Sequence, residues 1–169
     1  MSAPSGLRGA LAWIIQLLKV RLVDIRDWQR YVVRFKIQKL AYLLKYLSVP
    51  GLEGVAFNLY VNGPYSPDLA RAYYELAAEG LTEEELRSLA AGFEETALGA
   101  RPEVKHVAEV FARKPLWWME IASTAMLLAR RYGGLNEEAL YRLVRSAKPW
   151  VTREEFGSVH ACLKRLGLL

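Results

Sequence analysis

Cysteine is almost absent from this 169-residue sequence, since Cys162 is the only one. An internal disulfide is therefore excluded, and so is a metal site built from several cysteines. No apolar run reaches the roughly 18 residues that a membrane span requires, and the best candidate, residues 11–18, is interrupted by Gln16. The first residues also lack the charged and apolar regions of a secretory signal. These absences predict a cytoplasmic protein without a membrane partner.

Side-chain amides and aspartate are scarce as well. The sequence has three Asn, three Gln and three Asp, against 15 Glu, 15 Arg and 8 Lys, and its formal net charge is +5. An excess of Arg and Glu with few thermolabile amides is typical of a thermophilic protein. The basic balance is compatible with a nucleic-acid partner but does not require one, because temperature adaptation accounts for the same arginines.

Helical patterns dominate the rest of the chain. Apolar residues recur at helical spacing over about 7–19 and 33–47, and an apolar stretch at 116–132 predicts a longer helix. Residues 20–31 are ambiguous, with Asp24 and Asp27 as candidate caps. Further helix starts are predicted by capping residues or by proline at the first helical position, and they lie at Ser66-Pro67, Thr82, Pro102, Asn136 and Thr152.

One short segment has the pattern of a β-strand. Residues 55–61 alternate apolar and polar side chains, so Phe57, Leu59 and Val61 are expected to face the core. Residues 62–65 should form a turn, and residues 92–101 a mobile loop. The sequence therefore predicts one mainly α domain over residues 1–169, a compact bundle of about six to eight helices with a small β element near 55–61.

Catalytic and ligand-binding signatures are not found. The two histidines, His106 and His160, stand in no ligand pairing, and neither a nucleophile elbow nor a phosphate-binding loop occurs. Three of the four pairs or runs of Glu fall in the first turn of a predicted helix, where they complement the helix dipole. We therefore expect a non-enzymatic protein with no metal and no cofactor, and an enzyme with an unrecognised site is the least favoured alternative.

Basic and aromatic residues are interleaved in the second strong helix. Such a helix could lie along a phosphate backbone, with Arg34, Lys36, Lys39 and Lys45 as the contacting residues. The order of apolar helix, basic helix, β segment and turn also faintly resembles a winged helix-turn-helix. The same cations are also explained as the solvated face of an amphipathic helix, with tyrosines half buried at its edges. A DNA-binding regulator is therefore the alternative hypothesis.

Other aromatic residues indicate a protein-binding surface. Trp117 and Trp118 are adjacent in a predicted helix and cannot both face the core, and we assign Trp118 to a partner surface. The corner from Tyr60 to Ser66 is a second candidate. Tyr60, Asn62, Tyr65 and Ser66 stand beside a helix start, whose N–H groups suit an anion or a carbonyl.

Two segments resemble a known family. Arg34-Phe35-Lys36-Ile37-Gln38-Lys39-Leu40-Ala41-Tyr42-Leu43-Leu44 is similar to the K-[LI]-Q-K-L-x-Y-[FL] opening of Panacea-domain (SocA-like antitoxin) proteins and of the related YwgA-like uncharacterised proteins. Tyr60-Val61-Asn62-Gly63-Pro64-Tyr65-Ser66 resembles their second element, Y-x-x-G-P-[VFY]-[SP], which leads into a helix. Lys148-Pro149-Trp150 resembles a Pro-Trp near the end of the Panacea domain, although Ser146-Ala147-Lys148 replaces the Thr-His-Glu that often precedes it.

The resemblance implies a compact helical domain that works by protein contact. Panacea domains act as antitoxins that bind partner toxins, whereas the YwgA-like branch has no activity to carry over. The leading hypothesis is a protein-interaction module that binds a toxin or a regulatory protein, and a homodimer stays open as an alternative.

Overall fold

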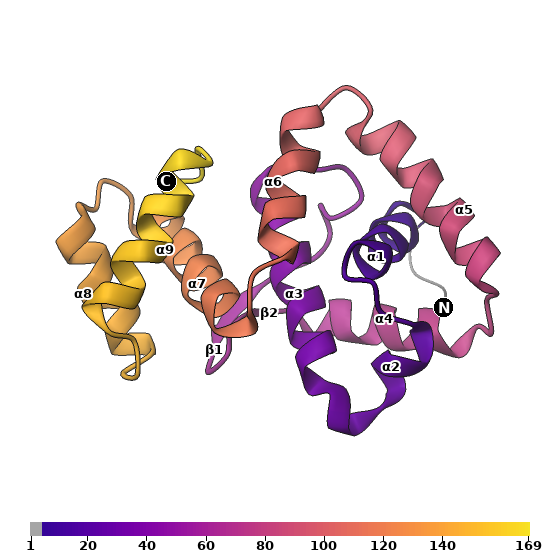
Figure 1. Ribbon diagram of the computed structural model, residues 1–169, viewed down its shortest axis with the longest axis horizontal. Coiled ribbons are helices and arrows are strands. Elements are labelled where there is room, and N and C mark those ends of the chain that lie inside the picture. The colour runs from indigo at the N-terminus through magenta and orange to yellow at the C-terminus, as the bar shows by residue number, and fades with distance from the viewer. Residues whose placement is uncertain (1–4) are drawn as a thin grey trace.

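Helices make up most of the computed structural model, which describes residues 5–169 (Figure 1). Within that range the α-helices are α1 (Ser5–Leu17), α2 (Leu22–Arg26), α3 (Tyr31–Tyr46), α4 (Pro67–Ala78), α5 (Glu83–Phe93), α6 (Pro102–Ala112), α7 (Leu116–Tyr132), α8 (Glu137–Ala147) and α9 (Arg153–Arg165). A 3₁₀ helix, η1 (Trp28–Arg30), precedes α3, and a π-helix, η2 (Glu94–Leu98), follows α5. The mainly α prediction is confirmed, and the helix beyond the expected six to eight is α2, which forms in the ambiguous segment.

The small β element is also confirmed, but its shape differs from the prediction. Strands β1 (Asn58–Tyr60) and β2 (Gly63–Tyr65) pair antiparallel, with Leu59 opposite Pro64. Residues 63–65, expected in a turn, are therefore the second strand. The turn is Val61-Asn62, so the prediction that Val61 faces the core is wrong, and its side chain is 83% exposed.

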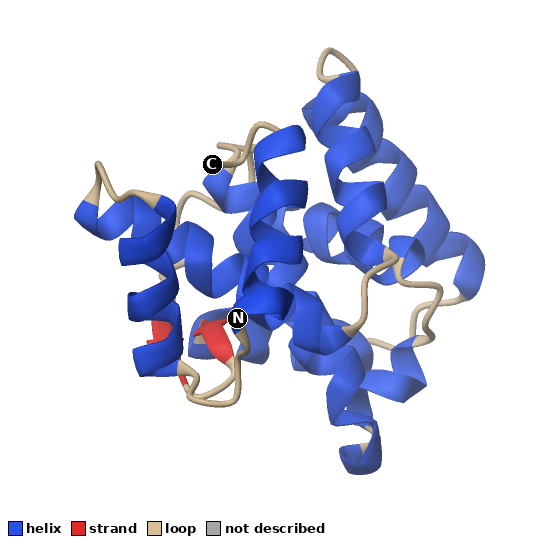
Figure 2. Cartoon of the chain, turned by 60° about the vertical axis from the view of Figure 1, so that its left-hand side comes forward, coloured by secondary structure: helices blue, strands red, loops and turns tan. Residues whose placement is uncertain are grey.

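Helix α3 lies at the centre of the molecule (Figure 1). Helices α1, α4 and α5 are on one side of it, and α7, α8 and α9 on the other. The predicted apolar stripe of α3 is buried at Ile37, Leu40, Ala41 and Leu44. The two short strands lie among the helices (Figure 2), and β2 packs on α3 and α7.

The predicted helix starts are confirmed atom by atom. The hydroxyl oxygens of Ser66, Thr82 and Thr152 each accept a hydrogen bond from the backbone N–H three residues later, at 3.1 or 3.2 Å. Asn136 does the same for Ala139 at 2.8 Å, and Pro102 is the first residue of α6. These side chains satisfy donors that a helix start leaves unpaired.

The loop expected at residues 92–101 is largely helical instead. Helix α5 runs to Phe93 and continues into η2. Glu94, at the junction, accepts a hydrogen bond from Trp13 Nε1 at 3.2 Å and pairs with Lys105. Contacts to α1 and α6 thus order a segment whose own sequence gave no helical period. Within residues 5–169, no helix combines the length and apolar character that crossing a bilayer requires.

Candidate functional site

The β1–β2 hairpin rests on a set of buried polar side chains. They come from α3, α7, the start of α4 and the end of α8, and none is more than 9% exposed. We name them the buried polar cluster: Gln38, Lys39, Ser66, Glu120, Ser123, Thr124 and Lys148. Buried polar groups are costly unless they are paired, so the partners of these residues show what the cluster does.

Gln38 fixes the chain where the hairpin becomes α4. Its side-chain amide donates to the Ser66 carbonyl at 3.0 Å, and its Oε1 accepts from the Ser66 N–H at 2.9 Å. Both backbone groups of Ser66 are therefore satisfied by one side chain of α3. The Ser66 hydroxyl at the same time caps α4 by accepting the Leu69 N–H. Ser66 is fully buried.

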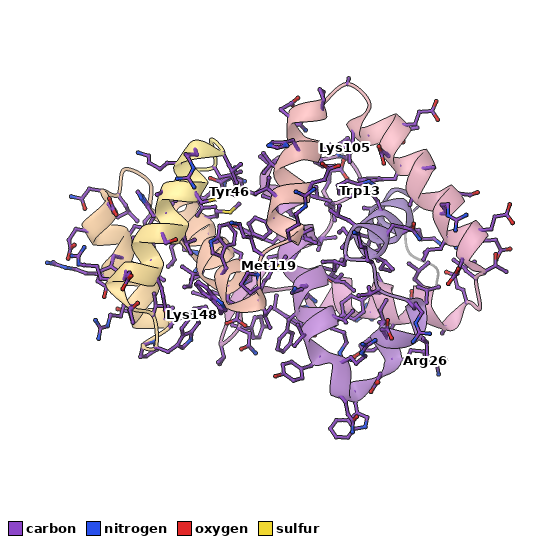
Figure 3. All side chains as sticks on the ribbon, viewed as in Figure 1. Trp13, Arg26, Tyr46, Lys105, Met119 and Lys148 are labelled. Atoms are coloured by element: carbon purple, nitrogen blue, oxygen red, sulfur yellow. The ribbon has the colours of Figure 1, made fainter. Side chains whose placement is uncertain are left out.

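Two lysines hold the hairpin itself. Lys39 Nζ donates to the Pro64 carbonyl oxygen at 3.1 Å, and Lys148 Nζ donates to the Val61 carbonyl oxygen at 2.7 Å. Glu120 Oε2 lies 3.6 Å from Lys148 Nζ, so one buried carboxylate compensates part of two buried positive charges. Lys148 lies at the end of α8, close to the first turns of α7 that carry Glu120 (Figure 3).

Burial shifts the pKa of all three charged groups of the cluster. Desolvation lowers the pKa of Lys39 to about 8, against the attraction of Glu120. Burial lowers the pKa of Lys148 in the same way, and it raises the pKa of Glu120 because both lysines only partly offset the loss of water. Perturbed groups are typical of functional sites, but buried ion pairs that serve structure show the same shifts.

Gly63 allows the hairpin to come close to the cluster. Its φ of +92° suits glycine, and a Cβ atom there would lie 3.2 Å from Thr124 Oγ1 and 3.3 Å from Lys39 Cε. The Thr124 hydroxyl is buried without a hydrogen-bond partner in the protein. The strand therefore packs against α3 and α7 at a distance that no other residue permits without displacement.

The cluster is sealed by the hairpin. None of its residues lines any of the four cavities described in the molecule. Both lysines already donate to backbone carbonyls, and the carboxylate faces them. The arrangement acts as a clamp that ties the hairpin to α3, α7 and α8.

The partner-binding residues expected from the sequence are separated by the structure. Tyr60 is 50% exposed and Asn62 is exposed. Tyr65 is half buried, with its ring 5.4 Å from that of Tyr60. Ser66 is buried as a helix cap, so its assignment to a partner surface is wrong, and it occupies the helix N-terminus that an anion was expected to use.

Trp118 is also wrongly assigned. It is 4% exposed, and its ring packs edge-on against Phe111 at 5.3 Å, with Lys114 Nζ 5.0 Å from it. One tryptophan of the pair does reach the surface, as expected, but it is Trp117, which is 45% exposed. The rotation of α7 about its axis determines which of the two tryptophans is buried, and Trp118 is the one that faces α6.

Two further exposed side chains adjoin the hairpin. Lys148 Nζ, which binds the Val61 carbonyl, is 5.8 Å from the centre of the Trp150 ring. Trp150 is 46% exposed. We name Tyr60, Val61, Asn62 and Trp150 the hairpin surface. The sequence-based prediction missed Val61 because it placed the turn one residue late, and it named Trp150 only within the Lys148-Pro149-Trp150 segment of the family resemblance.

The expected basic face of α3 is mostly turned inward. Lys39 is fully buried, so its assignment to a phosphate contact is wrong. Arg34 donates to the carbonyl oxygens of Ile25 and Trp28 at 3.0 and 3.1 Å, and Lys45 donates to that of Glu53 at 3.2 Å. Only Lys36 of the four has no such role among the described contacts, and it is half buried.

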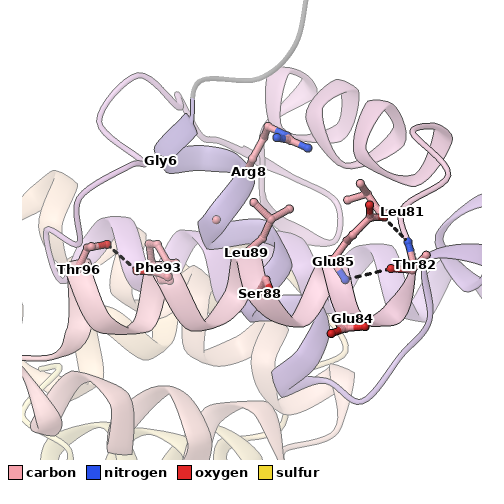
Figure 4. A pocket seen from close by; sticks show the side chains of 12 residues that line it. Gly6, Arg8, Leu81, Thr82, Glu84, Glu85, Ser88, Leu89, Phe93 and Thr96 are labelled. Atoms are coloured by element: carbon pink, nitrogen blue, oxygen red, sulfur yellow. Dashed lines mark hydrogen bonds between the residues drawn. The ribbon is translucent and has the colours of Figure 1, made fainter.

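A groove of about 990 Å³ runs between α1 and α5 (Figure 4). Leu81, Leu89 and Phe93 give it an apolar wall. Several of its polar residues are engaged elsewhere: Thr82 and Glu85 form the capping box of α5, and Arg8 pairs with Glu79 at the end of α4, although Arg8 Nε itself is buried without a hydrogen-bond partner. The groove thus offers space but no set of convergent reactive groups. Across residues 5–169, no three His, Cys, Asp or Glu side chains gather as a metal site would need.

Comparison with protein-family models, with curated proteins and with solved structures finds no match to this chain. Evidence for the function of this chain therefore comes from the site itself. One spatial relationship bears on it: the three segments quoted for the family resemblance meet at the buried polar cluster. The first contributes Gln38 and Lys39, the second Ser66 and the Pro64 carbonyl that Lys39 binds, and the third Lys148.

Proposed function

We propose that this protein is a non-enzymatic protein-binding module, antitoxin-like or regulatory, whose partner docks on the hairpin surface. The observation that carries the proposal is that large side chains are exposed on a backbone that is held in place from below. Tyr60, Val61 and Trp150 are 50, 83 and 46% exposed, while Lys39 and Lys148 hold the backbone beneath them.

Such an arrangement is favourable for binding a folded partner. Tyrosine and tryptophan are enriched among the residues that contribute most to protein–protein affinity. A surface already fixed in the free protein loses less conformational entropy on binding. Asn62 at the turn and the Tyr60 hydroxyl add polar groups at the rim, where hydrogen bonds to a partner help to fix its orientation.

A non-enzymatic role is supported by the buried charged groups, because they are already bound within the protein. Lys39 has the largest lysine pKa shift, which would suit a nucleophile or a base, but its amine binds the Pro64 carbonyl under the hairpin. A substrate could reach this amine only after the hairpin had been displaced. The DNA-binding alternative on α3 has little geometric support, because Arg34, Lys39 and Lys45 serve internal contacts.

The product of a gene beside the coding gene is the first candidate partner. Isothermal titration calorimetry should compare the wild type with a Tyr60→Ala/Trp150→Ala double variant, and we expect affinity to fall by roughly 30-fold or more. The matched control is Trp117→Ala/Tyr132→Ala, which removes two exposed aromatic side chains away from the hairpin surface. Equal losses in both double variants, or a wild type that binds only itself, would contradict the proposal.

A further inference from the structure

The positive charge of this protein is concentrated at one corner. Residues 19–36 carry six cations and two carboxylates, a formal charge of +4, while the whole chain has +5. The segment covers the end of the first loop, α2, η1 and the first turns of α3. This end of the molecule lies at the bottom of Figure 3, where Arg26 is labelled. A local field of one sign attracts a partner of the opposite sign.

Large apolar side chains are exposed at the same corner. Trp28 is 78% exposed, Tyr31 52%, Val32 38% and Val23 59%. Trp28 begins η1 and Tyr31 begins α3, with Arg30 between the two helices at a non-helical φ of −94° and ψ of 42°. The indole of Trp28 is the most exposed aromatic ring of the described chain, and no internal contact accounts for it.

The backbone under these rings is held firmly. Arg34 Nη1 and Nη2 donate to the carbonyl oxygens of Ile25, Asp27 and Trp28, at 3.0, 2.6 and 3.1 Å. The side chain of Asp24 is nearly buried, accepts the Arg21 N–H at 2.8 Å and pairs with Arg30. That backbone hydrogen bond, together with Arg30, lowers the pKa of Asp24 and keeps its carboxylate charged. The corner is thus ordered before any ligand arrives.

We propose that this corner, formed by Arg21, Arg26, Trp28, Arg30 and Tyr31, binds single-stranded nucleic acid. Proteins that bind single strands combine positive charge along the phosphates with aromatic rings on which bases stack. Here two exposed rings lie three residues apart in the chain, and arginines precede, separate and follow them. Arginine suits phosphate because its guanidinium can donate two parallel hydrogen bonds.

Charge argues against a second copy of this chain as the occupant, because a symmetric contact would bring two +4 corners together. Duplex DNA suits the corner less well, since its bases are stacked internally and offer no free face to Trp28. An acidic protein would satisfy the arginines as well, so the test below includes an acidic polypeptide as a competitor. This site is separate from the hairpin surface and does not depend on the function proposed there.

The test is fluorescence anisotropy with labelled oligo-dT and oligo-rU of about 20 nucleotides, and with a duplex of the same length. We expect both single strands to bind at least about tenfold more tightly than the duplex. Between about 50 and 200 mM salt, log K should fall with log salt at a slope near −2, as expected for about three phosphate contacts. The stronger of the two single strands then identifies the natural sugar class.

Variants locate the binding to the corner. Trp28→Ala should weaken single-strand binding by roughly 5- to 100-fold, since stacking on an aromatic ring contributes that much per base. Arg26→Gln should weaken it and reduce the salt slope by about 0.7. Trp117→Ala and Arg142→Gln, which change an exposed tryptophan and an exposed arginine elsewhere, should leave affinity unchanged.

Several outcomes would overturn the proposal. They are no binding at about 50 mM salt, preference for the duplex, and equal losses in the control variants. Competition by poly-glutamate as strong as that by oligo-dT would indicate an acidic protein instead. Self-association that Trp28→Ala abolishes, measured by light scattering, would indicate a second copy. Because Trp28 is mostly exposed, its replacement should not change the melting temperature, and this is measured alongside.

Discussion

Lys39 and Lys148 hold one hairpin from two different helices. Lys39 of α3 donates to the Pro64 carbonyl, and Lys148 at the end of α8 donates to that of Val61. Glu120 of α7 carries the compensating negative charge, so the central helix α3 and two helices from one side of it, α7 and α8, meet under one small sheet. A two-stranded hairpin is marginal by itself, and this clamp explains how three-residue strands stay ordered.

Replacing Lys148 with methionine should destabilise the protein strongly. The change leaves the Val61 carbonyl without its donor and takes away the nearest positive charge from the buried Glu120. Removing one member of a buried pair costs about 3 kcal/mol or more in the free energy of unfolding. Urea denaturation measures this loss, and Arg142→Met on the exposed face of α8 should change the same quantity by less than about 0.5 kcal/mol.

A second variant separates charge from packing at this position. If the unpaired Glu120 carboxylate causes the loss, then Lys148→Met combined with Glu120→Leu should recover part of it, because apolar replacement of a whole buried pair is often neutral. A double variant less stable than Lys148→Met would show that the carboxylate has another essential partner.

Lys39 should make stability depend on pH. Its pKa falls from the ordinary 10.5 to about 8 on folding because the amine is buried. Between these values the unfolded chain binds the proton more strongly than the folded chain, so the free energy of unfolding rises with pH across that window. Lys148, whose pKa is also lowered by burial, acts in the same direction. Raised tyrosine pKa values oppose the trend only above about pH 10.

The difference between wild type and Lys39→Met isolates this contribution. Denaturation at intervals from pH 7 to about 9.5 should give a stability difference that is constant below pH 8 and then grows in favour of the wild type. Lys36→Met, on the same helix but half buried, should give a nearly constant difference. Parallel curves for wild type and Lys39→Met would mean that Lys39 keeps its ordinary pKa.

The local part of the fold could be predicted from the sequence. Helix starts at Ser66, Thr82, Asn136 and Thr152 depend on a side chain and an N–H three residues away, so a short stretch contains all that decides them. The apolar stripe of α3 was predicted for the same reason. The short β element near 55–61 was found as well, although its turn was displaced.

The candidate site could not be predicted in the same way. A lysine in a helix is expected at the surface, and Lys39 is buried because its acceptor, the Pro64 carbonyl, lies 25 residues further along the chain. Lys148 reaches a carbonyl 87 residues away. Trp118 was assigned to a partner surface because two adjacent tryptophans do not reveal the rotation of their helix. Each error concerns a residue whose position is decided by tertiary partners.

Gln38 should be as important to the hairpin as the lysines. A Gln38→Leu change keeps the approximate volume but removes both hydrogen bonds to the backbone of Ser66. The buried Ser66 N–H is then unpaired, while the Ser66 carbonyl still accepts the Ala70 N–H at 3.1 Å, and we expect a loss of about 2 to 3 kcal/mol in the free energy of unfolding. Ser66→Ala removes only the cap of α4 and should cost about 1 kcal/mol. A reversed order in calorimetric unfolding would contradict this assignment.

Gly63 tests the close packing of the hairpin on the cluster. Gly63→Ala places a methyl group at a φ of +92°, 3.2 Å from Thr124 Oγ1 and 3.3 Å from Lys39 Cε. Positive φ and crowding each disfavour the new side chain, so the free energy of unfolding should fall by about 1 to 3 kcal/mol. Amide hydrogen exchange across residues 58–65 should also become faster, because the strand must move away from Lys39.

Gly54→Ala is the matched control for that change. A Cβ atom at Gly54 would meet nothing within 4 Å, and its φ lies outside the range that favours glycine. The substitution there should be neutral or stabilise the protein by up to about 1 kcal/mol, since alanine restricts the unfolded chain more than glycine does. Similar losses at both positions would show that the hairpin tolerates a side chain, and that the clamp does not depend on the close approach of Gly63. Loss at Gly63 alone, with faster exchange confined to the hairpin, is the result expected if Lys39, Thr124 and the strand are packed as described.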